Sequence, residues 1–150
     1  MNAGVWVPYI MFGDIEDVEM DSNVGLGARF GYNFGSESCV ELGVTGSNME
    51  ASDIDAEATL IVAQLGYVHN FIIDGSNFVP FATLGSGWFS QDGDADDDGP
   101  ILYGGGGTKY MFSDGFFGRL DLQVIQGYGE SDSDLSFAVG LGVEWTFGGN

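Results

Sequence analysis

One acidic stretch of the sequence carries carboxylates in an order that is typical of calcium loops. In the segment DADDDG, Asp94, Asp96 and Asp98 alternate with other residues, and Gly99 follows them. Oxygen ligands at alternate positions, followed by a glycine that permits a sharp turn, are what Ca²⁺ coordination requires. The bidentate acid expected at the twelfth position is absent, because Gly105 stands there. The pattern therefore predicts weak Ca²⁺ binding by the three aspartates or, alternatively, loose screening of a solvated loop by divalent ions.

Few other side chains offer catalytic or metal-binding chemistry. His69 is the single histidine, so any serine-type or histidine-based mechanism would have to use it, and it lies near a compact connection rather than an acidic loop. One histidine and one cysteine, Cys39, are too few for a zinc site, and a single cysteine forms no internal disulfide. The glycine run YGGGGTK is not followed by a helix and so is no phosphate loop. We expect a protein that is not an enzyme and has no resident cofactor.

The charge of the chain is strongly negative. Its 150 residues include 23 acidic and three basic side chains, which gives a formal net charge of −20. Without a basic patch to neutralise phosphates, nucleic-acid binding is excluded. Seventeen of the acids gather in four stretches, GDIEDVEMDSN, EASDIDAE, QDGDADDDG and ESDSD.

The spacing of apolar residues places these acidic stretches between β-strands. Eight segments alternate with a period of two, there is no convincing helical stripe, and no apolar run is long enough for a membrane-spanning helix. The segments cover residues 3–12, 24–34, 39–49, 58–71, 78–90, 100–112, 116–129 and 135–147. Compact turns follow the second, fourth and sixth segments, and acidic stretches follow the first, third, fifth and seventh. In an up-and-down meander, alternate connections emerge at the same end, so one end of the molecule is predicted to be strongly negative.

The two faces of the predicted strands differ in a way that distinguishes inside from outside. In VGLGARFGYNF and VGLGVEWTF, one face carries mainly large apolar groups and the other carries glycine, polar and charged groups. The glycine-bearing face collects every basic residue of the chain and an equal number of acids: Arg29, Lys109, Arg119, Glu41, Asp121 and Glu144. A water-exposed face of so acidic a protein has no reason to gather all its cations, whereas a confined interior must pair its charges. We therefore predict that the glycine-rich face lines a narrow lumen.

An apolar face that points outward is an aggregation hazard in water and a requirement in lipid. Aromatic residues gather near both ends of the strands, as membrane-interface belts do. They are Tyr32, Phe34, Tyr67, Phe71, Phe78, Phe81, Tyr110, Phe112, Phe116, Trp145 and Phe147 at the compact-turn end, and Phe12, Trp88, Phe89, Tyr103 and Tyr128 at the acidic end. The alternative is that these aromatics form an ordinary core. The sequence predicts an all-β, eight-stranded, antiparallel up-and-down transmembrane β-barrel over residues 1–150.

On these residues the chain resembles the OmpA-like eight-stranded outer-membrane β-barrels of Gram-negative bacteria. The resemblance covers nearly the whole chain and is sharpest in VGLGARFGYNFGSESCVELGV, FVPFATLGSGW, GGGGTKYMFSDGFFGRLDLQV and GLGVEWTF. It implies that Gly142, Trp145 and Phe147 form the terminal signal read by the outer-membrane assembly machinery. Three residues, GGN, follow this signal, and longer members of the family continue into a peptidoglycan-binding domain. The chain is therefore interpreted as a single barrel domain or as the N-terminal barrel of a longer protein.

The resemblance further implies a salt-bridge network that plugs or gates the lumen. Lys109, Arg119 and Asp121 match its positions, and the face assignment adds Arg29, Glu41 and Glu144. A permanent plug would leave a structural role in the envelope and a surface-interaction role, with acidic loops outside the cell and short turns in the periplasm. Its partners would be outer-membrane lipids, the assembly machinery and an extracellular partner of the acidic loops. The alternatives are a narrow or gated pore for ions or small solutes, and a soluble lipocalin-like ligand binder with an apolar interior.

Overall fold

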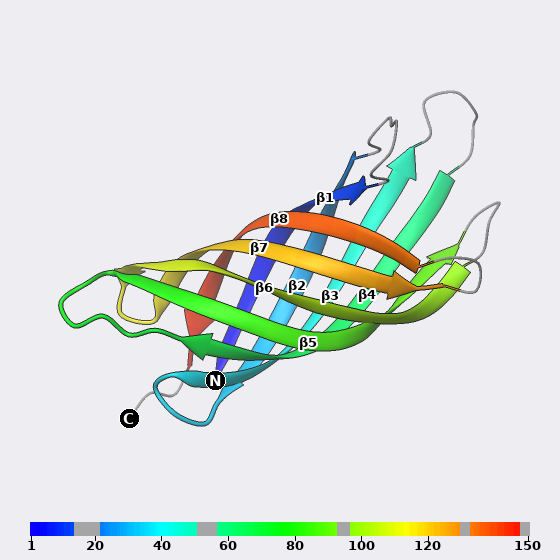
Figure 1. Ribbon diagram of the computed structural model, residues 1–150. Coiled ribbons are helices and arrows are strands. Elements are labelled where there is room, and N and C mark those ends of the chain that lie inside the picture. Colours follow the sequence, from blue (N-terminus) through cyan, green and yellow to red (C-terminus); the bar gives the residue numbers. More distant parts are fainter. Residues whose placement is uncertain (14–21, 51–56, 93–96, 130–132, 148–150) are drawn as a thin grey trace.

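Eight antiparallel strands, joined in sequence order, close into a barrel in the computed structural model (Figure 1). The structure describes residues 1–13, 22–50, 57–92, 97–129 and 133–147. The strands are β1 (Asn2–Gly13), β2 (Ser22–Asn33), β3 (Ser38–Glu50), β4 (Glu57–Asn70), β5 (Phe78–Asp92), β6 (Asp97–Ser113), β7 (Phe116–Tyr128) and β8 (Ser133–Thr146). Pairing of β1 with β8 closes the sheet. The predicted all-β up-and-down barrel is confirmed, and the predicted strand ends differ from these by at most three residues.

The compact turns lie together at one end of the barrel, where both ends of the described chain also lie (Figure 1). Gly75 and Gly115 adopt positive φ angles of 77° and 79°, which glycine reaches without steric cost. The amide of Met111 donates to the carbonyl of Asn77 at 2.9 Å, and other backbone bonds link neighbouring turns in the same way. The acidic stretches fall mostly outside the described residues, and the strand ends that flank them lie at the opposite end of the barrel (Figure 1).

Large apolar side chains point outward on all eight strands. Leu26, Leu84 and Leu141 are 67%, 70% and 65% exposed, whereas charged residues of the alternate positions, such as Arg119 and Asp121, are buried. This distribution is the one predicted from the strand faces, and it is the opposite of what a soluble ligand-binding barrel needs. The described part of the chain forms no helix that is long and apolar enough to span a membrane.

Aromatic rings form a belt on the outer surface at the compact-turn end. Five of them contact each other in turn across β5 to β8, with centroid separations of 4.8 to 5.7 Å: Phe78, Tyr110, Phe112, Phe116 and Trp145. A second run on the β2–β3 turn and β4 and its following turn joins Phe34, Tyr67, His69 and Phe71. These rings lie where the sequence predicts the belt.

Two aromatic residues predicted for the belts lie inside the barrel instead. Phe81 and Tyr103 are only 3% and 6% exposed. Phe81 shares the inward face of β5 with buried Thr83, and Tyr103 shares the inward face of β6 with Lys109. Phe89 falls on the same face of β5 as Phe81, and the side chain of Phe12 lies outside the described residues. The prediction was wrong because it used the position of each ring along the strand and ignored its face.

Candidate functional site

Arg119 on β7 is the centre of a network of buried charges in the lumen. Its Nη1 and Nη2 atoms donate to the two carboxylate oxygens of Glu41 on β3, at 2.6 and 3.2 Å, in the bidentate geometry that guanidinium favours. Its Nε and Nη2 donate to Oδ1 of Asp121 at 3.2 and 3.0 Å. Nη1 also donates to Oε2 of Glu144 on β8 at 3.1 Å. One guanidinium therefore holds three carboxylates that come from three strands.

Arg29 and Lys109 pair with the outer sides of this network. Nη1 of Arg29 donates to Oδ2 of Asp121 at 2.9 Å, and Nζ of Lys109 donates to Oε1 of Glu144 at 3.0 Å. Nδ2 of Asn2 donates to the same Glu144 oxygen at 2.8 Å. The structure thus brings all six predicted lumen charges together, with side-chain exposures from 1% to 11%. Their formal charges sum to zero, which is the condition under which buried ions are tolerated.

Glycines opposite the charged residues explain how such long side chains fit a narrow barrel. Most of the charged residues have at least one glycine as a direct cross-strand partner: Arg119 with Gly142, Asp121 with Gly107 and Gly140, Arg29 with Gly4 and Gly43, Glu41 with Gly31 and Gly66, and Glu144 with Gly4. A glycine carries no side chain toward the lumen, so the facing side chain can extend across it. The glycine-rich face is therefore what permits the charge network.

Two rings that the sequence analysis did not assign to the site pack against its guanidinium groups. The Cζ atom of Arg29 lies 3.7 Å from the ring centroid of Trp6, and that of Arg119 lies 4.4 Å from the ring centroid of Phe81. Guanidinium is weakly hydrated and stacks well on aromatic faces. Trp6 follows Gly4 by two positions on β1, so the two residues share a face of the strand. The alternation of β1 therefore already indicated that Trp6 points inward.

Two glycines also leave room for the side chain of Trp6. A Cβ atom built at Gly27 or at Gly140 would clash with the indole, which shows that the ring occupies the space in front of both glycines. The hydroxyl end of Tyr103 on β6 fills the space in front of Gly66 and Gly85 in a similar manner. An aromatic ring that covers a cross-strand glycine shields its backbone and fixes the register of the pair.

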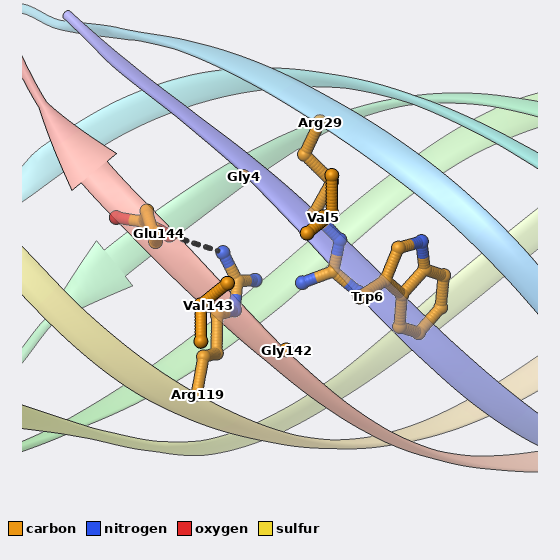
Figure 2. A pocket seen from close by; sticks show the side chains of 8 residues that line it. All are labelled: Gly4, Val5, Trp6, Arg29, Arg119, Gly142, Val143 and Glu144. Carbon is orange, nitrogen blue, oxygen red and sulfur yellow. Dashed lines mark hydrogen bonds and ion pairs between the residues drawn. The ribbon is translucent and has the colours of Figure 1, made fainter.

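Two small cavities adjoin Trp6, and each is about the size of one water molecule. Figure 2 shows the first, which lies between the guanidinium groups of Arg29 and Arg119 and is also lined by Glu144. The second is lined by side chains that are mostly apolar, together with Thr45 and Gln64. Nη2 of Arg29 and Nε1 of Trp6 are buried and have no hydrogen-bond partner among the residues that the structure describes.

The predicted assembly signal is divided between the two faces of β8. Gly142 lies on the lumen side, where its backbone is packed against Trp6. Trp145 points outward, with its ring centroid 5.5 Å from that of Phe116. Phe147 is exposed, and its amide donates to the carbonyl of Met1 at 2.7 Å. The role of these residues in assembly stays a prediction.

The predicted calcium ligands are only partly covered by the structure. Asp94 and Asp96 lie outside the described residues. Asp98 lies in β6, where its Oδ2 accepts a hydrogen bond from Nε1 of Trp88 at 3.2 Å. Within the described ranges, no three His, Cys, Asp or Glu side chains gather in a way that could hold a metal ion. Weak Ca²⁺ binding stays a prediction.

His69 and Cys39 lie in different surroundings. His69 belongs to the outer belt, with Nδ1 3.4 Å from the hydroxyl of Tyr67 and its ring centroid 4.9 Å from that of Phe71. The hydroxyl of Tyr67 also lies 2.9 Å from Oγ of Ser38. The thiol of Cys39 is buried on the lumen side, 3.8 Å from Oδ1 of Asn2. Neither residue contributes a hydrogen bond or an ion pair to the six-charge network.

A closed antiparallel barrel with an apolar exterior, an aromatic belt and paired charges in the lumen has the fold of the small outer-membrane β-barrels. Among solved structures, neisserial surface protein A superimposes with a TM-score of 0.83, with 11% sequence identity over 97% of this chain and 96% of that one. OprG of Pseudomonas aeruginosa gives a TM-score of 0.65, with 15% identity over 99% and 96% of the two chains. Ail, the attachment invasion locus protein of Yersinia pestis, gives 0.59, with 12% identity over 96% and 97%.

No protein-family model and no curated protein sequence matches the chain. At these identities the likeness to solved structures shows the fold. The resemblance to OmpA-like eight-stranded barrels is therefore confirmed as a likeness of fold, and the function must be argued from the site.

Proposed function

We propose that the protein is a transmembrane β-barrel of the Gram-negative outer membrane, with its compact turns in the periplasm and its acidic loops at the cell surface. Exposed apolar side chains on all eight strands would be an aggregation hazard in water and are what lipid contact requires. The belt of contacting rings at the compact-turn end suits a membrane interface. Outer-membrane lipids are then the surroundings of the barrel.

The role of this barrel is structural and interactive rather than catalytic, with a lumen closed by salt bridges. The observation that carries this proposal is the single Arg119 guanidinium bound to Glu41, Asp121 and Glu144. Opening a path through the network would leave buried charges without partners, which is costly. A closed barrel stabilises the envelope and presents its anionic loops to cations or to an extracellular partner. Gly142, Trp145 and Phe147 would be read by the assembly machinery.

The alternative function is a narrow or gated pore for ions or small solutes. It is favoured by one observation, the unpartnered Nη2 of Arg29 beside a small cavity within the network. A polar group of this kind is a point at which water can enter a lumen.

Two measurements on the purified protein test the proposal. We expect the protein to need detergent and to migrate differently on unboiled and boiled gels, as a stable barrel does. In planar bilayers the wild-type protein should then give no single-channel conductance. A monomer that is soluble in plain buffer would contradict the membrane barrel, and regular conductance steps from the wild type would favour the pore.

A further inference from the structure

The position of Trp6 points to a second closure of the lumen. We propose that Trp6, whose ring is stacked on Arg29 of the charge network, seals the lumen on the loop side of that network, so that two barriers lie in series. This inference rests on the proposed function of a closed barrel, because it concerns what closes it.

The two cavities define where Trp6 lies along the barrel. The inward-facing residues of β1 run in order from Gly4 through Trp6 and Pro8 to Ile10, from the compact-turn end toward the loop end. Gly4 lines the cavity within the charge network, Pro8 and Ile10 line the second cavity, and Trp6 lines both. The indole of Trp6 is therefore part of the wall between them. In Figure 2 it lies beside the guanidinium of Arg29, on the side away from Arg119.

The adjoining strands β8 and β7 give the same order. Glu144 lines the cavity within the network, and Ala138, which is nearer the loop end of β8, lines the second cavity. On β7 the corresponding residues are Arg119 and Ile125. The second cavity is therefore on the loop side of the network in three strands, and Trp6 lies between the two.

The surroundings of Trp6 hold it in place as a seal. Its ring is stacked on Arg29 at 3.7 Å, and that guanidinium is itself tied to Asp121 at 2.9 Å. On its other sides the indole is packed against the backbones of Gly27 and Gly140, where a larger residue would not fit. Trp6 as a whole is only 5% exposed. A side chain enclosed by two backbones and a paired cation has little freedom to swing away.

Each of the two cavities has a buried polar atom beside it that a water molecule could satisfy. Nη2 of Arg29 lacks a partner where the first cavity lies, and Nε1 of Trp6 lacks one near Thr45, which lines the second. A buried donor of this kind is normally satisfied by water, and both cavities have room for about one molecule. The structure thus assigns one water site to each side of the stacked pair.

Two barriers in series make a specific prediction about variants. Arg119→Ala removes the centre of the charge network and leaves two cations facing three carboxylates, but Trp6 still closes the lumen. Trp6→Ala removes the ring, but the network still closes it. We expect both single variants to be as silent as the wild type in planar bilayers, and Trp6→Ala/Arg119→Ala to give discrete conductance steps. Because the remaining lumen charges sum to −1, these steps should be cation-selective.

Two matched variants control for the loss of a tryptophan and for the loss of its N–H. Trp88 points outward and is 51% exposed, so Trp88→Ala/Arg119→Ala should stay silent. Trp6→Phe/Arg119→Ala keeps an aromatic ring on Arg29 and should stay silent too. Every sample is first required to show the heat-modifiable gel shift of a folded barrel. If Trp6→Ala/Arg119→Ala fails that requirement, Trp6→Leu/Arg119→Gln, which keeps more side-chain volume, takes its place.

The possible failures are distinguishable. Conductance from Arg119→Ala alone, equal to that of the double variant, would show that Trp6 seals nothing. It would not contradict the proposal that the charge network plugs the wild-type lumen. A folded but silent double variant would also overturn the inference. Conductance from Trp6→Ala alone would refute the series arrangement and the plug, and conductance from the wild type would refute the closed barrel itself.

Discussion

Removal of Arg119 should destabilise the barrel through one identifiable carboxylate. In Arg119→Met, Asp121 keeps its 2.9 Å contact with Arg29, and Glu144 keeps its 3.0 Å contact with Lys109. Glu41 loses both of its short bonds and retains only Nε of Arg29 at 3.9 Å. Glu41 is therefore the carboxylate that the substitution leaves without a hydrogen-bonded partner.

The size of the effect follows from the burial of the network. Arg119 is 2% exposed and Glu41 is 11% exposed, so solvent does little to compensate the lost partner. Removal of one partner of a buried ion pair costs about 3–5 kcal/mol. We expect the free energy of unfolding of Arg119→Met to fall by about that amount. Neutralisation of the orphaned carboxylate in Arg119→Met/Glu41→Gln should recover part of the loss, by about 0.5–3 kcal/mol.

The assay is urea unfolding of the detergent-folded protein, followed by tryptophan fluorescence and by the fraction of the heat-modifiable band on unboiled gels. Arg119→Met/Glu144→Gln is the matched control. This variant also removes a carboxylate, but it leaves Glu41 unpaired and Lys109 without Glu144. It should therefore recover less of the lost free energy of unfolding than Arg119→Met/Glu41→Gln. A loss below about 1 kcal/mol in Arg119→Met, a value typical of exposed ion pairs, would refute the network as a buried unit. Equal recovery by both double variants would refute the assignment of Glu41 as the orphan.

Three further predictions concern the rest of the barrel. Gly140→Ala would push a Cβ atom into the ring of Trp6 and should lower the free energy of unfolding by about 1–3 kcal/mol in the same urea titration; Gly46→Ala, which has open space, should lose nothing comparable. The Cys39 thiol is buried, so a maleimide should label it in urea and not in the folded barrel, and rapid labelling of the folded protein would contradict its position. If Asp98 takes part in Ca²⁺ binding, millimolar Ca²⁺ should change the fluorescence of the tryptophan bonded to it, and Asp98→Asn should abolish that change.

The strand order and the lumen charges were predictable because alternation fixes the face of each residue. Arg29, Arg119 and Asp121 stand among glycines on strands whose other face is apolar, and that contrast needs no knowledge of the fold. Which carboxylate receives the bidentate pair of hydrogen bonds from Arg119 was not predictable. It depends on how β3 and β7 face one another across the lumen, and no period in the sequence encodes that relation.

The interior rings were missed for a different reason. Trp6, Phe81 and Tyr103 all have the inward parity of their strands, so the signal was present. Assigning rings to a belt only because they lie near the strand ends ignores this inward parity. The glycines facing these rings, such as Gly27 and Gly85, were interpreted as features of a narrow bore, and they also serve as recesses that the rings occupy.

The placement of all three basic residues inside the lumen has a consequence for proteolysis. Trypsin cuts after lysine and arginine, and the chain offers it only Arg29, Lys109 and Arg119. Each side chain is at most 8% exposed and lies within a hydrogen-bonded strand. The folded barrel therefore presents no cleavage site to trypsin at all, loops included, whereas the unfolded chain presents all three. The fraction of protein that remains uncut by trypsin therefore measures the folded fraction directly, in detergent, in vesicles or on whole cells.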